Sequence, residues 1–153
     1  MTKNTLDYLC KASGWLVALT NIHWSAVSMS QHKLCDEIFD TLKDFRDKIA
    51  EISQGISENI KINDLKATDY NISDLEGFIK DVIRDTTEFY KNLEGDDNIG
   101  LRSVTEAFIG DFQQYIYLNR FCIKKDLQEA VQKRMSEIIK EEVHNFMQNL
   151  YKD

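Results

Sequence analysis

Apolar residues recur every three or four positions through most of the chain, which is the spacing of an amphipathic helix. This pattern predicts five helices, over residues 4–27, 31–54, 73–94, 101–124 and 126–151. The 153 residues include no Pro and only six Gly, the two residues that interrupt helices most strongly. The sequence therefore predicts an all-α fold in a single domain spanning residues 1–153, a length that can bury a sizeable core.

Each predicted helix carries an apolar stripe that we expect to pack in the core. The stripes consist of Leu6, Leu9, Leu16, Val17, Leu19 and Trp24; Leu34, Ile38, Leu42, Phe45, Ile49 and Ile52; Leu75, Phe78, Ile79, Val82, Ile83, Phe89 and Leu93; Val104, Phe108, Phe112, Tyr115, Ile116 and Leu118; and Leu127, Val131, Ile138, Ile139, Phe146 and Leu150.

Capping signals mark the ends of these helices. They are Asn4 or Thr5 before the first helix, Ser28-x-x-Gln31 before the second, Gly55 as the stop of the second, Ser73-x-x-Glu76 before the third, a turn over residues 95–98, and Asp126-x-x-Glu129 before the fifth. Residues 56–72 between the second and third helices have weak periodicity and form a connection. A bundle whose second and third helices run parallel needs a long crossover at that place.

Four side chains of metal-ligand type share one face of the second helix. With His32 set to zero, Asp36 lies at about 40°, Asp47 at about 60° and Glu51 at about 100° around the helix axis. The apolar stripe of this helix lies between about 200° and 280°, so the ligand-type face points away from the core. We expect it to face solvent or another chain.

The spacing along the axis decides how these side chains could hold an ion. The pair His32 and Asp36 lies about 22 Å from the pair Asp47 and Glu51, too far for both pairs to bind one ion. If two copies of the helix cross antiparallel near Leu42, each pair meets the other pair of its partner and two equivalent sites form. Imidazole with carboxylate ligands suits divalent iron or zinc better than calcium or magnesium. A solvated acidic face is the structural alternative for a helix rich in Asp, Glu and Lys.

Charge and cysteine content limit the other functions. Cys10, Cys35 and Cys122 have neither metal-ligand nor disulfide-framework spacing, so we expect reduced thiols and a cytoplasmic protein. The sequence has no leader pattern and no apolar run long enough to cross a membrane. The formal net charge of −7 predicts weak DNA binding or none, since phosphate contacts need clustered Lys and Arg.

The chain resembles the Dps-like mini-ferritins (DNA-binding proteins from starved cells). The likeness rests on His23-Trp24 late in the first helix, then His32-x3-Asp36, then Asp47-x3-Glu51. In that family the first three ligands bind iron with the last two of a two-fold mate. The link from His23 to His32 is shorter than is usual there and lacks the customary Gly and aromatic residue. Outside this segment the likeness is one of helix order.

The resemblance implies a ferritin-like four-helix bundle, with the long crossover between helices 2 and 3 and, here, an extra C-terminal helix. It implies a ferroxidase: non-haem iron, bound by His23, His32, Asp36, Asp47 and Glu51 across a homodimer interface, is oxidised by hydrogen peroxide or dioxygen and stored or detoxified. It also implies a homododecameric shell. The alternative is a ferritin-like helical protein without iron chemistry that has a structural or partner-binding role. The shorter link and the added helix favour that alternative.

Overall fold

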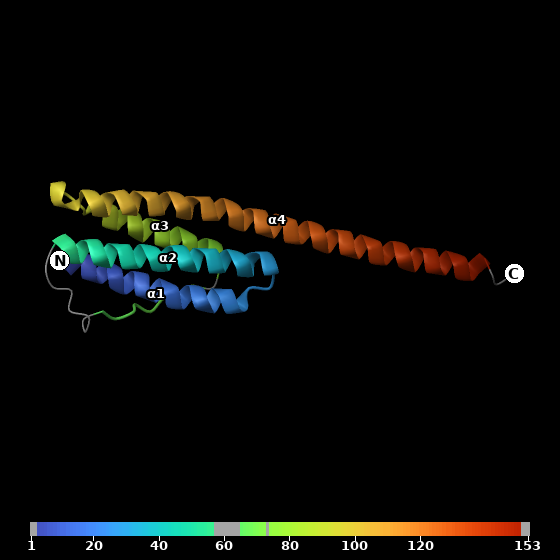
Figure 1. The fold of residues 1–153 in the computed structure, drawn as a ribbon. Coiled ribbons are helices and arrows are strands. Elements are labelled where there is room, and N and C mark those ends of the chain that lie inside the picture. The colour runs from blue at the N-terminus through green and yellow to red at the C-terminus, as the bar shows by residue number, and fades with distance from the viewer. Residues whose placement is uncertain (1–2, 57–64, 73, 151–153) are drawn as a thin grey trace. The chain divides into compact units, whose positions relative to one another are not determined.

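All regular structure in the described part of the chain is helical (Figure 1). The computed structural model describes residues 3–56, 65–72 and 74–150. Its elements are α1 (Lys3–Ser25), α2 (Met29–Ile56), α3 (Leu75–Lys91), the short 3-10 helix η2 (Asp96–Asn98) and α4 (Ile99–Leu150). The predicted all-α class is confirmed. Among the described helices, none has a stretch apolar and long enough to cross a lipid bilayer.

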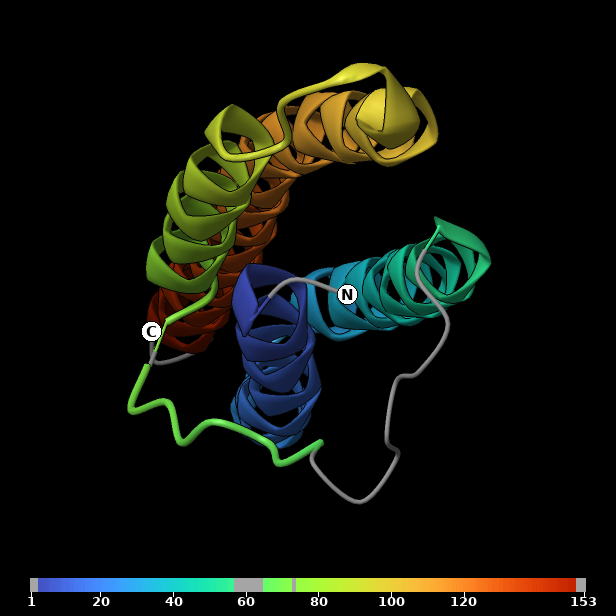
Figure 2. The ribbon, with the colours of Figure 1, turned by 90° about the vertical axis from the view of Figure 1, so that its left-hand side faces the viewer.

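The chain divides into two compact units, residues 1–119 and residues 120–153. The first unit contains α1, α2, α3 and the beginning of α4, and the second contains the rest of α4. Within the first unit α2 runs back along α1, and α3 runs in the same direction as α2 (Figures 1 and 2). Two parallel helices need a connection that returns along the bundle, and the long segment between Ile56 and Leu75 has the length for this.

Side chains from all four helices fill the core of the first unit. Tyr8 of α1 stacks on Phe89 of α3 with ring centroids 4.0 Å apart, and Phe45 of α2 stacks on Phe108 of α4 at 3.7 Å. Aliphatic residues complete the packing around these rings; fully buried examples are Leu9, Leu19, Ile38, Leu42, Ile49, Ile79 and Val82. The apolar stripes predicted for α2 and α3 are therefore largely buried in this core, to which α1 and α4 also contribute.

A polar contact fixes α1 against α3 inside the core. The hydroxyl groups of Tyr8 and Thr86 lie 2.8 Å apart, and burial raises the pKa of Tyr8. The carboxylate of Asp85, which is also buried, forms ion pairs with Nζ of Lys11 at 3.4 Å and with Nε of Arg84 at 3.1 Å. Because buried polar groups are costly unless paired, these contacts specify how the two helices meet.

Helix starts were predicted better than helix ends. The Ser28 hydroxyl accepts the backbone N–H of Gln31 at 3.1 Å, which confirms Ser28 as the cap of α2. Gly55 was wrongly predicted to stop α2, since the helix continues to Ile56. Of the predicted capping box before α3, Ser73 lies outside the described residues, and the carboxylate of Asp74 caps the helix by accepting the Gly77 N–H at 2.7 Å.

Three further boundaries differ from the prediction. α1 already includes Lys3, so neither Asn4 nor Thr5 is its cap. It ends at Ser25 instead of the predicted Val27. α3 ends at Lys91, before the predicted Glu94. The turn over residues 95–98 is confirmed: Gly95 adopts a φ of 89°, which an L side chain rarely adopts, and η2 follows.

The fourth and fifth predicted helices are one helix in the structure. α4 runs from Ile99 to Leu150 through the predicted break at Lys125 and Asp126, so the separate extra C-terminal helix was a wrong prediction. No Gly or Pro lies near this position, and an Asp inside a helix costs only a few tenths of a kcal/mol relative to better helix formers. A capping signal alone does not interrupt a helix whose flanking residues all favour it.

The loop before α3 packs closely on α1 at Gly14. The Thr68 N–H donates to the Cys10 carbonyl at 3.0 Å, and a Cβ added at Gly14 would lie 1.9 Å from the Thr68 carbonyl oxygen. Gly14→Ala must therefore shift backbone, and we expect it to lower the free energy of unfolding by about 1–3 kcal/mol. Denaturant unfolding followed by circular dichroism measures this change.

Gly110→Ala is the matched control for this prediction. Gly110 also lies inside a helix, but an added Cβ there meets nothing within 4 Å. Helix propensity alone then applies, and we expect a gain of roughly 0.5–1 kcal/mol. Equal effects of the two substitutions would contradict the close contact at Gly14.

Candidate metal centre

A histidine near the end of α1 lies against a histidine in the first turn of α2. The link between these helices is short: the Ala26 N–H donates to the His23 carbonyl at 3.2 Å, and Ser28 then caps α2. The rings of His23 and His32 are stacked with centroids 3.8 Å apart and an interplanar angle of 29°. The short link thus places the two imidazoles in direct contact.

Asp36 joins the two histidines from the next turn of α2. Its Oδ1 lies 3.0 Å from Nε2 of His23, and Asp36 follows His32 by four residues, so both point from the same side of α2. One ligand atom from each of the three residues lies within 4.8 Å of the others. Within residues 3–56, 65–72 and 74–150, this is the one group of three or more such side chains with that geometry.

The buried nitrogen of His23 has no hydrogen-bond partner. Nε2 is buried and its contact with Asp36 is short, yet the contact lacks the alignment of a hydrogen bond. The His23 side chain is 22% exposed, whereas Asp36 is 62% exposed. A buried polar atom without a partner carries a free-energy cost, which a cation bound among the three groups would remove.

A hollow of about 200 Å³ opens beside this cluster. His23, Asp36 and Phe39 line it together with Leu19, Thr20 and Cys35. Burial, and then the neighbouring Asp36 carboxylate, raise the pKa of the Cys35 thiol to about 11. Without a bound metal ion, the thiol therefore stays protonated at neutral pH, and the side chain is buried.

Two apolar side chains of α1 that were predicted to be buried are exposed. Trp24, directly after His23, is 75% exposed and Val17 is 58% exposed. The prediction that both belong to the core was wrong. The helical stripe of α1 is broader than the surface that α2 and α3 cover, so the remainder of the stripe faces outward.

Asp47 and Glu51 lie apart from the three clustered residues. Both side chains are exposed on α2, three to four turns beyond Asp36. Asp47 Oδ1 accepts Nη2 of Arg46 at 2.9 Å and its Nε at 3.1 Å. One chain therefore brings together three of the five predicted ligands and holds the other two on the same helix, outside the cluster.

A family model matches residues 23–118 of the chain. The chain belongs to DUF5856, a family of unknown function. The matched segment contains all five predicted ligands, and residues 120–150 of α4 lie beyond it. No curated protein and no solved structure matches the chain.

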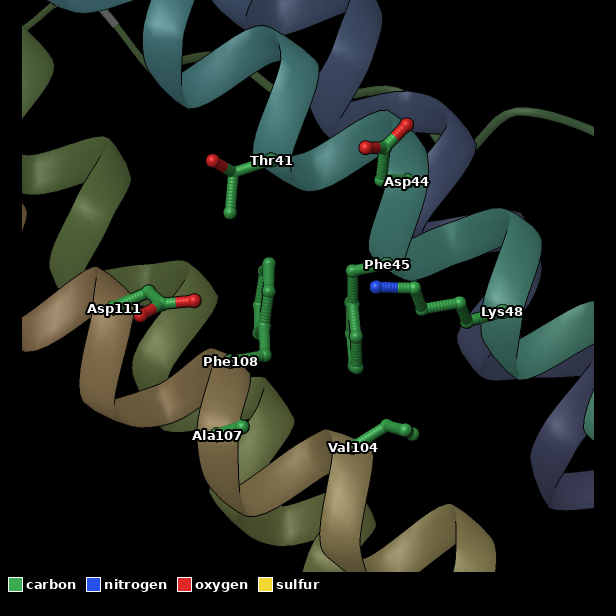
Figure 3. Close-up of a pocket in the computed structure, with 8 residues that line it drawn as sticks. All are labelled: Thr41, Asp44, Phe45, Lys48, Val104, Ala107, Phe108 and Asp111. Carbon is green, nitrogen blue, oxygen red and sulfur yellow. The ribbon is translucent and has the colours of Figure 1, made fainter.

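A second hollow of this DUF5856 chain lies between α2 and α4, with a volume of about 290 Å³ (Figure 3). The stacked rings of Phe45 and Phe108 lie between the two helices, and Asp44, Lys48 and Asp111 surround them. The sequence analysis did not identify this hollow. Its two walls come from helices about 60 residues apart in sequence, so only their packing brings the residues together. Its carboxylates, Asp44 and Asp111, do not belong to a group of three or more close ligand-type side chains, whereas Asp36 does.

Proposed function

We propose that this chain binds ferrous iron at His23, His32 and Asp36 and oxidises it in a site completed by Asp47 and Glu51 of a second copy. One observation carries the proposal: two imidazoles and one carboxylate from two helices come within 4.8 Å of one another. Two histidines with one carboxylate, leaving open coordination positions, are typical of non-haem ferrous sites. The net charge of −7 also suits a cationic substrate.

The imidazoles and the carboxylates of the site would each favour a different oxidation state of the bound iron. Neutral imidazoles of His23 and His32 suit ferrous iron, whereas carboxylates, as hard oxygen ligands, favour the ferric product. The unpartnered Nε2 of His23 supports a bound cation, because this atom would then gain its missing partner. The three groups alone leave room for further ligands, which Asp47 and Glu51 of another chain would supply.

The proposal needs a two-fold dimer, and the surface around the cluster supports one. Trp24 and Val17 are exposed on α1, and Phe39 lies beside Asp36 on the same face of α2. Fully solvated faces gain nothing from such residues, whereas dimer interfaces are enriched in aromatic side chains. The parallel course of α2 and α3 supports the ferritin-like bundle that the resemblance implies (Figure 1). A cytoplasmic twelve-subunit shell is part of the same proposal.

A structural or partner-binding role without iron chemistry is the second candidate. The contact between Arg46 and Asp47 favours this structural role, because the Arg46 guanidinium is paired with the carboxylate that the iron site would use. Exposed ion pairs contribute only about 0–1 kcal/mol, however, so a metal ion would displace this arginine at little cost. The two candidates therefore differ in one measurable property, which is iron oxidation.

Titration of the purified protein with ferrous iron, followed by addition of hydrogen peroxide, tests the proposed function. We expect rapid growth of ferric absorption that saturates at a fixed number of iron ions per dimer. Prior addition of zinc, which uses the same ligand types but has no redox chemistry, should suppress the rapid phase. Oxidation no faster than in buffer, with no saturation, would contradict ferroxidase activity and favour the structural role.

A further inference from the structure

Seven large apolar side chains on the second part of α4 are exposed and evenly spaced. They occupy every fourth position: Ile123, Leu127, Val131, Met135, Ile139, Val143 and Met147. Between 43% and 64% of each is exposed. Residues four apart on a helix are neighbours, so the seven form a continuous ridge that turns about 40° around the helix axis at each step. Its central part, around Val131, Met135 and Ile139, faces one side of the helix, where Ile138 and Phe146 widen it.

A ridge of this size is unusual on a helix surrounded by water. Scattered exposed apolar residues are normal, but a contiguous apolar surface marks an interaction site. Helices gain most of their stability from packing an apolar face, and an isolated helix is marginal in water. The uninterrupted helix through residues 120–150 therefore indicates a partner for this ridge.

Charge along the helix indicates what the partner is. The first half, residues 120–134, has five basic residues (Arg120, Lys124, Lys125, Lys133 and Arg134) and two acidic ones. The second half, residues 135–150, has three acidic residues (Glu137, Glu141 and Glu142) and one basic one. An antiparallel copy of this helix would therefore place its acidic half beside the basic half, whereas a parallel copy would place like charges together.

We propose that this ridge packs against the same ridge of a second copy of the chain, with the two helices antiparallel and crossing at Met135. The central part of the ridge is symmetric about that residue: Val131 then opposes Ile139 of the other copy, and both lie within about 40° of Met135 around the helix axis. Lys124 lies about one helical turn, roughly 6 Å along the axis, from Glu142 of the other copy. Such a self-complementary contact is what two-fold symmetry requires.

The chemistry of the ridge does not fit a lipid surface. Residues 120–150 carry six basic and five acidic side chains, close to balance. Helices that bind membrane surfaces combine an apolar face with an excess of Lys and Arg. The proposed contact uses neither the iron ligands nor Phe39, so it can be tested independently of iron oxidation.

Cross-linking between two full-length variants tests both the contact and its direction. All three native cysteines are first replaced, Cys10 and Cys122 by Ser and Cys35 by Ala. Gln128→Cys is then introduced into one preparation and Glu142→Cys into another. These two positions lie seven residues before and after Met135, so an antiparallel pair centred on Met135 places them opposite each other. Identical positions lie about 21 Å apart along the axis. We expect a mild oxidant or a short bis-maleimide to cross-link the mixture and neither variant alone.

Two additional substitutions identify the ridge as the surface involved. Met135→Glu places a charge at the crossing point and should lower the cross-linked yield at least tenfold. Ser136→Glu adds the same charge at the adjacent position and should leave the yield unchanged. Both residues are exposed, so neither change disturbs a core, and circular dichroism verifies helical content.

Two results would overturn the proposal. Cross-linking of Gln128→Cys chains to one another would show a parallel arrangement. No cross-linking in any mixture, with helical content retained, would show that a second copy does not cover the ridge.

Discussion

Replacing His32 or Asp47 by alanine is expected to abolish rapid ferrous oxidation, lowering its initial rate at least about 100-fold, because loss of even an outer partner of a metal ligand costs 10–100-fold. His32 belongs to the cluster that the chain forms by itself, and Asp47 does not. An equal loss from both substitutions is therefore the signature of a site completed by a second chain. Stopped-flow absorbance after mixing with limiting iron measures the rate.

Glu37→Ala is the control for these two variants. Glu37 is an exposed carboxylate next to Asp36 on α2, but it is not part of the cluster. Its removal changes the charge by the same amount as Asp47→Ala and should leave the rate within twofold of wild type. Full activity in His32→Ala or Asp47→Ala would show that these residues only form a solvated face.

Phe39→Lys is expected to separate the dimer and thereby to remove iron oxidation. Phe39 lies beside Asp36 and close to the proposed two-fold axis near Leu42, so both copies of the new lysine would face each other. An aromatic residue near the centre of an interface is typically worth 2 kcal/mol or more. With one substitution on each side, the dimer dissociation constant should rise at least about 100-fold. Sedimentation velocity at micromolar concentration measures the change in chains that also carry Met135→Glu, so that the contact proposed for α4 does not hold them together.

Tyr117→Lys is the matched control, since Tyr117 is an aromatic residue of α4 that is 65% exposed and does not line the hollow beside the cluster. It should leave both assembly and oxidation unchanged. A wild-type protein that sediments as a monomer at micromolar concentration would contradict the shared site outright. A Phe39→Lys protein that remains dimeric would place the interface elsewhere.

The part of the site within one helix was accessible from sequence because helical geometry is regular. His32 and Asp36 fall on one face by their spacing alone, and Ser28 caps α2 as predicted. The approach of His23 depends on the link of residues 26–28, whose backbone course no periodicity specifies. The contact between His23 and His32 could therefore be identified only from the structure.

The errors share a physical cause, which is that packing decides between locally acceptable alternatives. The Asp126 signal resembled a helix start, but most residues around it, such as Lys125, Leu127 and Glu129, are good helix formers, so α4 continues. Trp24 and Val17 belong to an apolar stripe, yet the part of the chain that the structure describes leaves them exposed. The hollow at Phe45 and Phe108 arises only when α2 and α4 meet.

Complementation between the two inactive variants tests the shared iron site most directly. In a mixed dimer of His32→Ala and Asp47→Ala chains, one site receives both lesions. The other site combines an intact cluster with an intact Asp47 and Glu51 pair. Each mixed dimer should then have at most half of the wild-type activity, and a statistical mixture should have about one quarter.

The chains must be refolded together so that they exchange, and native mass spectrometry verifies the mixed species. The account predicts that oxidation returns on mixing, although neither variant is active alone. A site confined to one chain cannot recover in this way, because every chain carries a lesion. Mixed dimers that form but remain inactive would contradict the shared site.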